Sequence, residues 1–366
     1  MSKKLQLLSG DIHLPAFLPD ATRSVVRAVD NQDLERCGVQ GLVMSTFHLM
    51  QNPGSSTIQA LGGLHSFSGW KHPIITDSGG FQIYSLIRQN KKNGTLTDKG
   101  LIFRTDKGSK VNLTPEKSIQ LQMSYKPDIM YCLDDCTDVS ESEIVQEEAV
   151  NRTIKWAKRC RNEYDKLVKD KRLSEQERPL IFGIIQGGRS KTLREKCANE
   201  LLEIGFDGFG YGGWPLDNQG QLLRDMISYT RDIVPSQFPL HALGIGHPSS
   251  IIEASQMGYD IFDSALPTRD ARTGRLYRLN IPLDELSLNS ITTNWFEYIY
   301  IEDKKHIKSK SNICDLTKSY TSTQYSLGYL HHLYSIGDTL FFRLATIHNL
   351  TFISQLMKKL RISGGR

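Results

Sequence analysis

The sequence predicts an α/β protein, a (β/α)8 TIM barrel with a β-hairpin insertion and an appended C-terminal helical subdomain. Two observations predict the barrel. Eight short apolar or β-branched runs recur before residue 280, and segments with helical spacing lie between them. In addition, acidic, amide and glycine residues follow many of these runs, as expected for a site at the C-terminal ends of barrel strands. A doubly wound open sheet is the alternative architecture that this pattern allows.

The eight strand-like runs mostly end in polar or glycine residues. They are Phe17–Thr22, Leu42–Thr46, Ile74–Ser78, Ile129–Asp135, Leu180–Gly188, Gly208–Gly213, His241–Gly246 and Ile261–Leu266. Helical spacing of apolar residues is found in Glu141–Lys169, Ser190–Ile204, Gln219–Ile233 and Ser249–Met257. Because the C-terminal strand ends of a barrel face one site, Asp77, Asp134, Gln186 and Asp263 are predicted to lie together.

Two segments depart from a minimal barrel. Residues 89–112 are polar and rich in Lys, Gly and Asn, with alternating apolar residues that indicate a small β-hairpin. After residue 280 the repeat stops, and Tyr325–Leu344 and Thr346–Leu360 are predicted to be helices. We therefore divide the chain into residues 1–280, a catalytic barrel with the insertion, and residues 281–366, a C-terminal subdomain.

Composition narrows the class of protein. The six cysteines are scattered without a Cys-x-x-Cys pair, which is typical of reduced thiols in a cytoplasmic protein. The first residues lack an apolar signal core, and no stretch is long and apolar enough to span a bilayer, so no membrane partner is expected. The net charge of +5 allows a polyanionic partner such as RNA without requiring one.

Two aspartates carry the strongest chemical signal. Asp77 and Asp263 each follow or end an apolar run, and Asp77 is followed by Ser78 and two glycines. Two carboxylates that converge on one pocket can divide nucleophilic attack and proton transfer at an anomeric carbon. Alternatively, the Asp77 motif is only a strand-to-helix turn with a capping side chain. The acidic pair that begins at Asp134 ends an otherwise apolar strand, which favours a binding role over capping.

Several longer motifs together resemble the tRNA-guanine transglycosylases, also described as queuine tRNA-ribosyltransferases. The resemblance covers nearly the whole chain in order and is closest to the bacterial type. The motifs are Asp77–Gln82, Ser45–Leu49 with Asn52–Gly54, Phe182–Gly188, Asp263–Gly274, Tyr329–Leu333 and Thr346–Leu350.

The resemblance implies a reaction. Asp263 is the implied nucleophile, which attacks the ribose of a tRNA guanosine at the wobble position (34) and forms a covalent aspartyl-ribose intermediate. Asp77 is the implied general acid/base, which protonates the departing guanine and deprotonates an incoming 7-deazaguanine base. The implied partners are therefore tRNA and that base. No ATP or redox cofactor is needed, because one glycosidic bond replaces another.

The resemblance also implies how the substrates are held. Asp134 accepts hydrogen bonds from the guanine edge, and Ser78 helps to seat the base. Further implied contacts are donation to the base carbonyl by Gln186 and the Gly213 N–H, stacking by Phe81, and binding of the anticodon loop by Arg269 and Arg272.

The chain departs from the family at its structural zinc site, which reads Cys-x-Cys-x-x-Cys followed later by His. Counting back from the motif with two adjacent histidines places Thr317, Ser319 and Ser322 at the cysteine positions, while His348 is retained. Neutral hydroxyls are poor zinc ligands compared with thiolates. We expect no bound zinc, the alternative being that Cys314 is a ligand.

A second departure concerns the incoming base. Bacterial members carry a glutamate after the pocket glycine that supports recognition of an aminomethyl group, but residues 214–218 contain none, and Pro215 stiffens the loop. Cys136 is bacterial-like, whereas Leu216 is bulkier than the glycine of queuine-using relatives. The incoming base is either the prequeuosine base or queuine, with a slight preference for the first.

Two other functions remain as alternatives. Paired carboxylates on this barrel also suit a hydrolytic N-glycosidase or nucleosidase, which releases a base without exchange. A non-catalytic tRNA-binding subunit is the other, but that class loses active-site aspartates, and both Asp77 and Asp263 are present. The resemblance further implies a homodimer.

Overall fold

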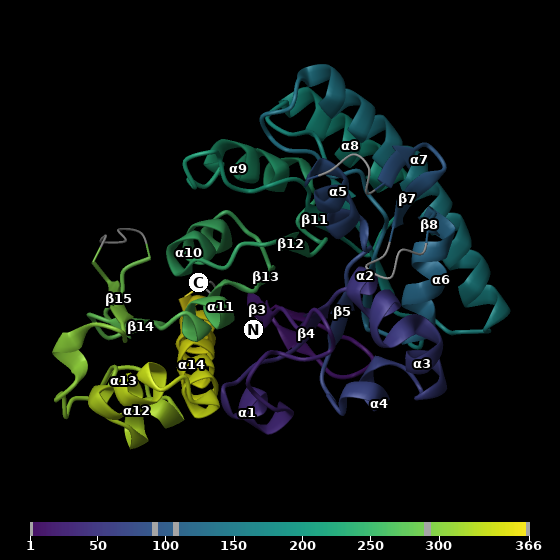
Figure 1. Ribbon diagram of the computed structural model, residues 1–366. Helices are drawn as coiled ribbons and strands as arrows, with labels where there is room; N and C mark the ends of the chain where they lie inside the picture. Colours follow the sequence, from purple (N-terminus) through teal and green to yellow (C-terminus); the bar gives the residue numbers. More distant parts are fainter. Residues whose placement is uncertain (1–2, 90–93, 105–109, 289–293, 364–366) are drawn as a thin grey trace.

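Eight parallel strands form the central sheet of the computed structural model, which describes residues 3–89, 94–104, 110–288 and 294–363 (Figure 1). The strand order is β3-β13-β12-β11-β10-β9-β5-β4. Their bounds are β3 Ala16–Pro19, β4 Leu42–Met44, β5 Ile74–Thr76, β9 Ile129–Tyr131, β10 Leu180–Ile185, β11 Gly208–Tyr211, β12 Leu240–Ala242 and β13 Ile261–Ser264.

The two end strands of this sheet meet. A parallel bridge joins Asp20 to Val43, and the Ala21 N–H donates to the Val43 carbonyl at 2.7 Å. The sheet is thereby closed into a barrel, which confirms the predicted TIM barrel and excludes the open doubly wound sheet. All eight predicted strands are found, but each ends earlier than predicted. The residues just beyond the strand ends form the loops at the C-terminal edge.

Helices surround the barrel. The connecting helices are α1 Asn31–Arg36, α2 Thr46–Leu49, α3 Ser55–Ala60, α4 Leu64–Ser68, α5 Gly80–Gln89, α6 Pro115–Tyr125, α7 Glu143–Asp170, α8 Lys191–Ile204, α9 Arg224–Ile233, α10 Pro248–Gln256 and α11 Leu266–Arg272, with a π-helical turn at Met50–Gly54. The four predicted helices correspond to α7, α8, α9 and α10. None of the helices in the described part of the chain combines the length and apolar character needed to cross a membrane.

The barrel core is divided into two layers. One set of buried side chains fills the barrel interior, including Leu18, Ile75, Phe182 and Ile261, and a larger set lies between the strands and the helices. This division follows from the strand period of two, because both faces of a barrel strand are buried. A short N-terminal hairpin, β1 Lys4–Leu5 with β2 Ile12–His13, adds apolar residues to the interior set.

The predicted insertion near residues 89–112 is described only in part, since residues 90–93 and 105–109 lie outside the described ranges. The described part forms a three-stranded antiparallel sheet rather than a hairpin: β6 Gly94–Thr97, β7 Gly100–Arg104 and β8 Lys110–Leu113. The third strand was not predicted because only the central run shows clear alternation. Phe103 contacts Phe47, with ring centroids 5.2 Å apart, so the insertion packs beside the barrel loops.

The C-terminal region begins with an antiparallel pair, β14 Arg275–Leu279 and β15 Phe296–Tyr300. A 3-10 turn at Lys304–His306 and helices α12 Tyr320–Gln324, α13 Leu327–Ser335 and α14 Thr339–Ser363 follow. The predicted helix boundary near Leu344 is wrong. Gly337 adopts a φ of +68°, and its N–H donates to the Tyr334 carbonyl, so the first helix ends there.

Helix α14 is held against the barrel by a buried asparagine. It runs beside α1, α10, α11 and β3 (Figure 1). Asn349 Nδ2 donates to the carbonyls of Pro267 and Arg275, both at 3.0 Å, and its Oδ1 accepts from the Tyr277 N–H at 3.1 Å. Because Pro267 follows β13 closely, this side chain links the last helix to the strand that carries Asp263. The division at residue 280 remains our proposal.

Asn349→Ala is expected to lower the free energy of unfolding by about 3 kcal/mol, because two carbonyls and one N–H lose their partners in a buried site. The measurement is urea unfolding followed by circular dichroism. Gln324→Ala, at an exposed position on α12, is the matched control and should change stability by less than about 0.5 kcal/mol. Equal stability of the two variants would contradict the role of Asn349.

Candidate functional site

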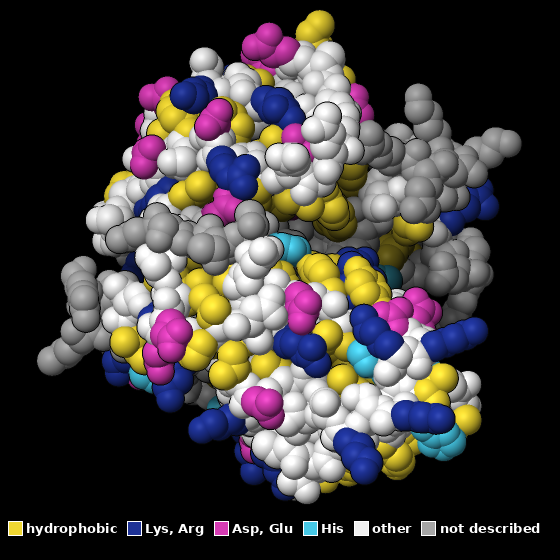
Figure 2. All heavy atoms as spheres, turned by 90° about the vertical axis from the view of Figure 1, so that its left-hand side faces the viewer, with side chains coloured by type: hydrophobic (Ala, Val, Ile, Leu, Met, Phe, Trp, Pro, Cys, Tyr) yellow, Lys and Arg dark blue, Asp and Glu magenta, His cyan; other side chains and the backbone are white. Residues whose placement is uncertain are grey.

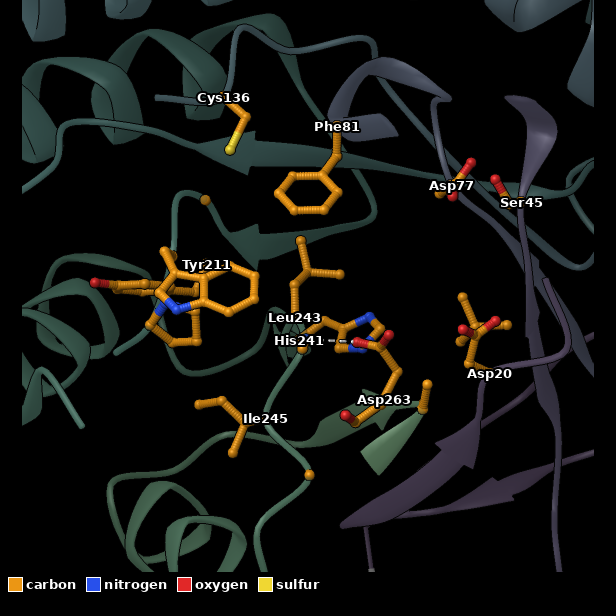
Figure 3. A pocket seen from close by; sticks show the side chains of 18 of the residues that line it. Asp20, Ser45, Asp77, Phe81, Cys136, Tyr211, His241, Leu243, Ile245 and Asp263 are labelled. Carbon is orange, nitrogen blue, oxygen red and sulfur yellow. Dashed lines mark hydrogen bonds and ion pairs between the residues drawn. The ribbon is translucent and has the colours of Figure 1, made fainter. Parts of the chain in front are cut away.

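A cavity of about 460 Å³ opens at the C-terminal end of the barrel (Figure 3). It is lined by residues of all eight barrel strands or of the loops that follow them, so the barrel itself brings them together. The sequence-predicted residues that line it are Asp77, Ser78, Phe81, Asp134, Gly213, Asp263 and Arg269. Two predicted site residues, Gln186 and Arg272, do not line the cavity, and Gln186 is buried. The structure therefore brings most of the predicted strand-end residues into one cavity.

Asp77 follows β5 directly and is held by three donors. Its Oδ1 accepts from the N–H groups of Thr46 at 2.8 Å and Gly79 at 3.0 Å, and its Oδ2 accepts from Gln82 Nε2 at 2.8 Å. Burial nevertheless raises the pKa of Asp77 to about 6. A carboxyl with this pKa is present in both protonation states near neutral pH, which suits it to proton transfer.

Asp134 lies three residues beyond β9 and is also buried. Gln186 Nε2 donates to its Oδ2 at 2.7 Å, and Ser78 Oγ donates to its Oδ1 at 3.3 Å. Burial raises the pKa of Asp134 to about 7, despite these hydrogen bonds. Gly212 is required next to this pair, since a Cβ there would lie 2.7 Å from the Gln186 amide.

Asp263 belongs to β13, and its side chain is 17% exposed. Its Oδ1 accepts from the Gly244 N–H at 2.9 Å and lies 3.0 Å from Nε2 of the buried His241. Asp20, one residue past β3, is a fourth carboxylate in the same cavity. Burial raises the pKa of Asp20, and the negative charge of Asp263 adds to the shift. Figure 3 shows Asp20, Asp77 and Asp263 around the same space.

Two aromatic rings stand at the cavity. Phe81 is 45% exposed and Trp214 is 48% exposed, and their rings lie nearly parallel, with centroids 6.2 Å apart and an interplanar angle of 12°. The other tryptophans, Trp70, Trp156 and Trp295, are buried. Exposed flat apolar surface of this kind suits a planar heteroaromatic ligand.

The rim of the cavity is positively charged. Arg269 is exposed and lines the cavity, and Arg272 lies one turn further along α11. Burial lowers the pKa of Arg272, and the charges of Arg27 and Arg269 lower it further, so these three guanidinium groups lie close to one another. Such a cluster suits an anionic partner.

Sequence reasoning missed three residues of the site. Asp20 carried the same signal as Asp77, a carboxylate at the end of a predicted strand, and could have been found from it. His241 was predicted only as the start of a strand. Tyr131, whose hydroxyl lies 2.7 Å from His241 Nδ1, ends β9 and showed no signal beyond its apolar surroundings.

Two of the three positions expected to replace zinc cysteines, Ser319 and Ser322, lie against His348 in the C-terminal region, while Thr317 is buried without a hydrogen-bond partner for its hydroxyl in the described part of the chain. Ser319 Oγ lies 2.9 Å and Ser322 Oγ 3.2 Å from His348 Nδ1. His348 Nε2 donates to the Tyr277 carbonyl at 2.6 Å, so Nδ1 is the acceptor of the hydroxyl hydrogens. Burial lowers the pKa of His348 to about 4 and keeps the ring neutral.

These residues do not fit a zinc ion. Thr317, Ser319 and Ser322 offer neutral hydroxyls in place of thiolates, and His348 Nδ1 is already hydrogen-bonded. Cys314 Sγ faces the Leu279 carbonyl at 3.8 Å. Across the ranges that the structure describes, no three His, Cys, Asp or Glu side chains gather into a metal-binding group.

The chain is similar to one family over almost its whole length. The family described as Queuine tRNA-ribosyltransferase matches residues 2–363. A protein of that name from Blochmanniella pennsylvanica is 36% identical, covering 96% of this chain and 88% of the relative. Those from Nitratidesulfovibrio vulgaris and Francisella tularensis subsp. novicida are 35% and 34% identical, covering 99% and 98% of this chain and 90% of each relative.

Asp134→Asn is expected to raise the free energy of unfolding relative to the wild type more at pH 8 than at pH 5. The raised pKa means that the folded state binds this proton more tightly than the unfolded state, so the stability from proton binding is present below about pH 4 and is lost as the pH rises through 7. The neutral variant escapes this loss. Its stability relative to the wild type should therefore increase by about 2 kcal/mol between pH 5 and pH 8.

Urea unfolding at the two pH values measures this difference. Asp225→Asn, on the exposed side of α9, is the matched control and should show no such change. A pH-independent difference for Asp134→Asn would show that burial does not destabilise its charge.

Proposed function

Because this chain belongs to the queuine tRNA-ribosyltransferase family, we propose that it exchanges the guanine at the wobble position of a tRNA anticodon for a 7-deazaguanine base. It is thus a pentosyltransferase of queuosine tRNA modification. The observation that carries the proposal is the single cavity lined by Asp77, Asp134 and Asp263, which offers a nucleophile, an acid/base and a base-binding carboxylate together.

The proposed reaction runs through two displacements at C1′ of the ribose. In the first, an Asp263 oxygen bonds to C1′ while the bond from C1′ to guanine N9 breaks, and protonated Asp77 gives the departing base a proton. In the second, the incoming base returns a proton to Asp77 and bonds to C1′, which releases the Asp263 carboxylate. The pKa of about 6 at Asp77 supports both directions of this proton transfer.

Base recognition is assigned to Asp134. Its carboxylate can accept both N–H groups on the guanine edge, and Ser78 and Gln186 already fix its orientation. The family resemblance assigns donation to the base carbonyl to Gln186 and the Gly213 N–H, of which Gly213 lines the cavity and Gln186 acts here through its contact with Asp134. Two N–H donors from the base would offset the cost of a buried charge at Asp134.

The tRNA must present the wobble base outside the anticodon stack to reach this cavity. Phe81 is placed to stack on the extruded base, and Arg269 and Arg272 to bind phosphates or neighbouring bases of the loop. Figure 2 shows further Lys and Arg side chains over the part of the surface that carries the C-terminal helices. A homodimer, which rests on the family resemblance, and a cytoplasmic location, which rests on the scattered cysteines, complete the proposal.

The choice of incoming base is assigned to the loop after β11. Trp214 and Pro215 stand where the bacterial pattern has smaller residues, and Leu216 lines the same cavity. A bulky apolar wall of this kind leaves little space for a large 7-substituent, which supports the prequeuosine base over queuine.

Asp263→Asn is expected to abolish both base exchange and the covalent RNA–enzyme complex, since an amide is a poor nucleophile. Exchange is measured with labelled guanine, the prequeuosine base and queuine in parallel, and the complex by denaturing gel electrophoresis. Binding of the free base, followed by Trp214 fluorescence, should be retained in the variant. Trp214→Phe is the control that assigns the fluorescence change.

The outcomes separate the functions. Incorporation of a labelled base into tRNA supports the transferase, and release of guanine without incorporation indicates a hydrolase. A covalent complex that persists in Asp263→Asn would refute the assignment of the nucleophile.

We also propose that the C-terminal region needs no zinc. The hydroxyls of Ser319 and Ser322 donate to His348, and His348 donates to a backbone carbonyl, so these three residues at the family's metal position are joined to one another, whereas the buried Thr317 hydroxyl has no hydrogen-bond partner among the described residues. A closed set of hydrogen bonds can stabilise a buried cluster without a metal.

Metal analysis of the purified protein is expected to find far less than one zinc per chain, and a chelator should leave the thermal unfolding midpoint unchanged. A triple variant, Thr317→Cys with Ser319→Cys and Ser322→Cys, supplies three thiolates beside His348 and should bind about one zinc per chain. Stoichiometric zinc in the wild-type protein would overturn the proposal.

A further inference from the structure

A chain of three buried or half-buried side chains ends at the proposed nucleophile. Tyr131 Oη lies 2.7 Å from His241 Nδ1, and His241 Nε2 lies 3.0 Å from Asp263 Oδ1. Tyr131 and His241 are buried, and they come from β9 and β12, which are not neighbours in the sheet. The contact therefore crosses the barrel interior. Figure 3 shows the His241 ring beside the Asp263 carboxylate.

The protonation of His241 follows from its two neighbours. A lone pair on Nε2 facing a carboxylate oxygen at 3.0 Å would be repelled, so Nε2 carries a hydrogen. Nδ1 is then the acceptor and Tyr131 the donor. Burial and the charge of Asp263 raise the pKa of Tyr131 well above its usual value, so its hydroxyl keeps the hydrogen that it donates.

The two carboxylate oxygens of Asp263 consequently differ. Oδ1 receives the Gly244 N–H at 2.9 Å and faces the His241 N–H, whereas no described residue is recorded as donating to Oδ2. His241 Nε2 is buried and forms no hydrogen bond of suitable geometry with any described residue, and the Asp263 Oδ1 atom 3.0 Å away is the acceptor that we assign to it. A carboxylate bound on one oxygen presents the other to the cavity.

We propose that His241, oriented by Tyr131, is a positioning residue that binds Oδ1 of Asp263 and leaves Oδ2 as the oxygen that attacks the ribose. The inference rests on the proposed transferase function.

No proton passes through His241 in the proposed reaction. Oδ2 uses a lone pair to bond C1′, the bond from C1′ to N9 breaks with its electrons on the base, and Asp77 supplies the proton to that base. Oδ1 becomes the ester carbonyl oxygen and keeps its two donors. In the second displacement the ester bond breaks, its electrons return to Oδ2, and the same donors stabilise the carboxylate that leaves.

Three variants test the inference. His241→Leu removes the donor and should lower kcat about 100-fold, the usual effect of losing one oriented donor at an active site. His241→Gln places an amide N–H near Nε2 and should restore kcat to within about 5-fold of the wild type. Tyr131→Phe removes one oxygen and leaves Nδ1 unpaired, and should lower kcat about 5-fold. The KM values for tRNA and base should be unchanged in all three.

The measurements are steady-state exchange and the single-turnover rate of covalent complex formation, which should fall by the same factors. Tyr125→Phe is the matched control. Tyr125 is a buried tyrosine on α6 whose hydroxyl binds Ser55, and its loss should leave kcat unchanged. If His241→Leu does not fold, the kcat values of His241→Gln and Tyr131→Phe still test the inference.

Wild-type kcat in Tyr131→Phe, together with wild-type or merely unstable His241→Leu, would overturn the positioning role while leaving the transferase intact. A rise in KM that accounts for the loss of activity would do the same. If the wild-type protein itself exchanges no base, the proposed function fails, and the variants are not needed to show it.

Discussion

The structure depends on burying carboxylates at one edge of a closed barrel. Asp77, Asp134 and Asp263 all face a single cavity, and a buried carboxylate is costly unless N–H groups surround it. The loops that follow the strands supply those groups, through Thr46 and Gly79 for Asp77 and through Gly244 for Asp263. The same burial raises the pKa of two of these carboxyls into the range where protons move at neutral pH.

The loop conformations follow from this requirement. Gly79 and Gly244, whose N–H groups donate to Asp77 and Asp263, both have positive φ, a conformation that glycine adopts without strain. Gly212 has a different reason, because a Cβ there would collide with the Gln186 amide. The glycines beside the acidic residues therefore belong to the carboxylate sites and not to generic turns.

The C-terminal region also buries polar side chains, and there their hydrogen-bond partners are neutral groups. His348 is buried with its two nitrogens joined to serine hydroxyls and a backbone carbonyl, so neither charge nor metal is required to satisfy it. Asn349, the next residue, forms three hydrogen bonds that join α14 to the segments behind the nucleophile. One turn of α14 thus connects this cluster to the barrel.

The sequence by itself determined the alternation of strands and helices, the carboxylates at strand ends and the hydroxyls that replace thiolates. These features are local, since strand period and turn residues are read over a few positions. Tertiary structure alone decided which groups meet. Tyr131 and His241 are 110 residues apart, and Asp20 is a fourth carboxylate of the site only because β3 closes against β4. These contacts form because the barrel closes, and a sequence pattern that spans a few residues cannot predict them.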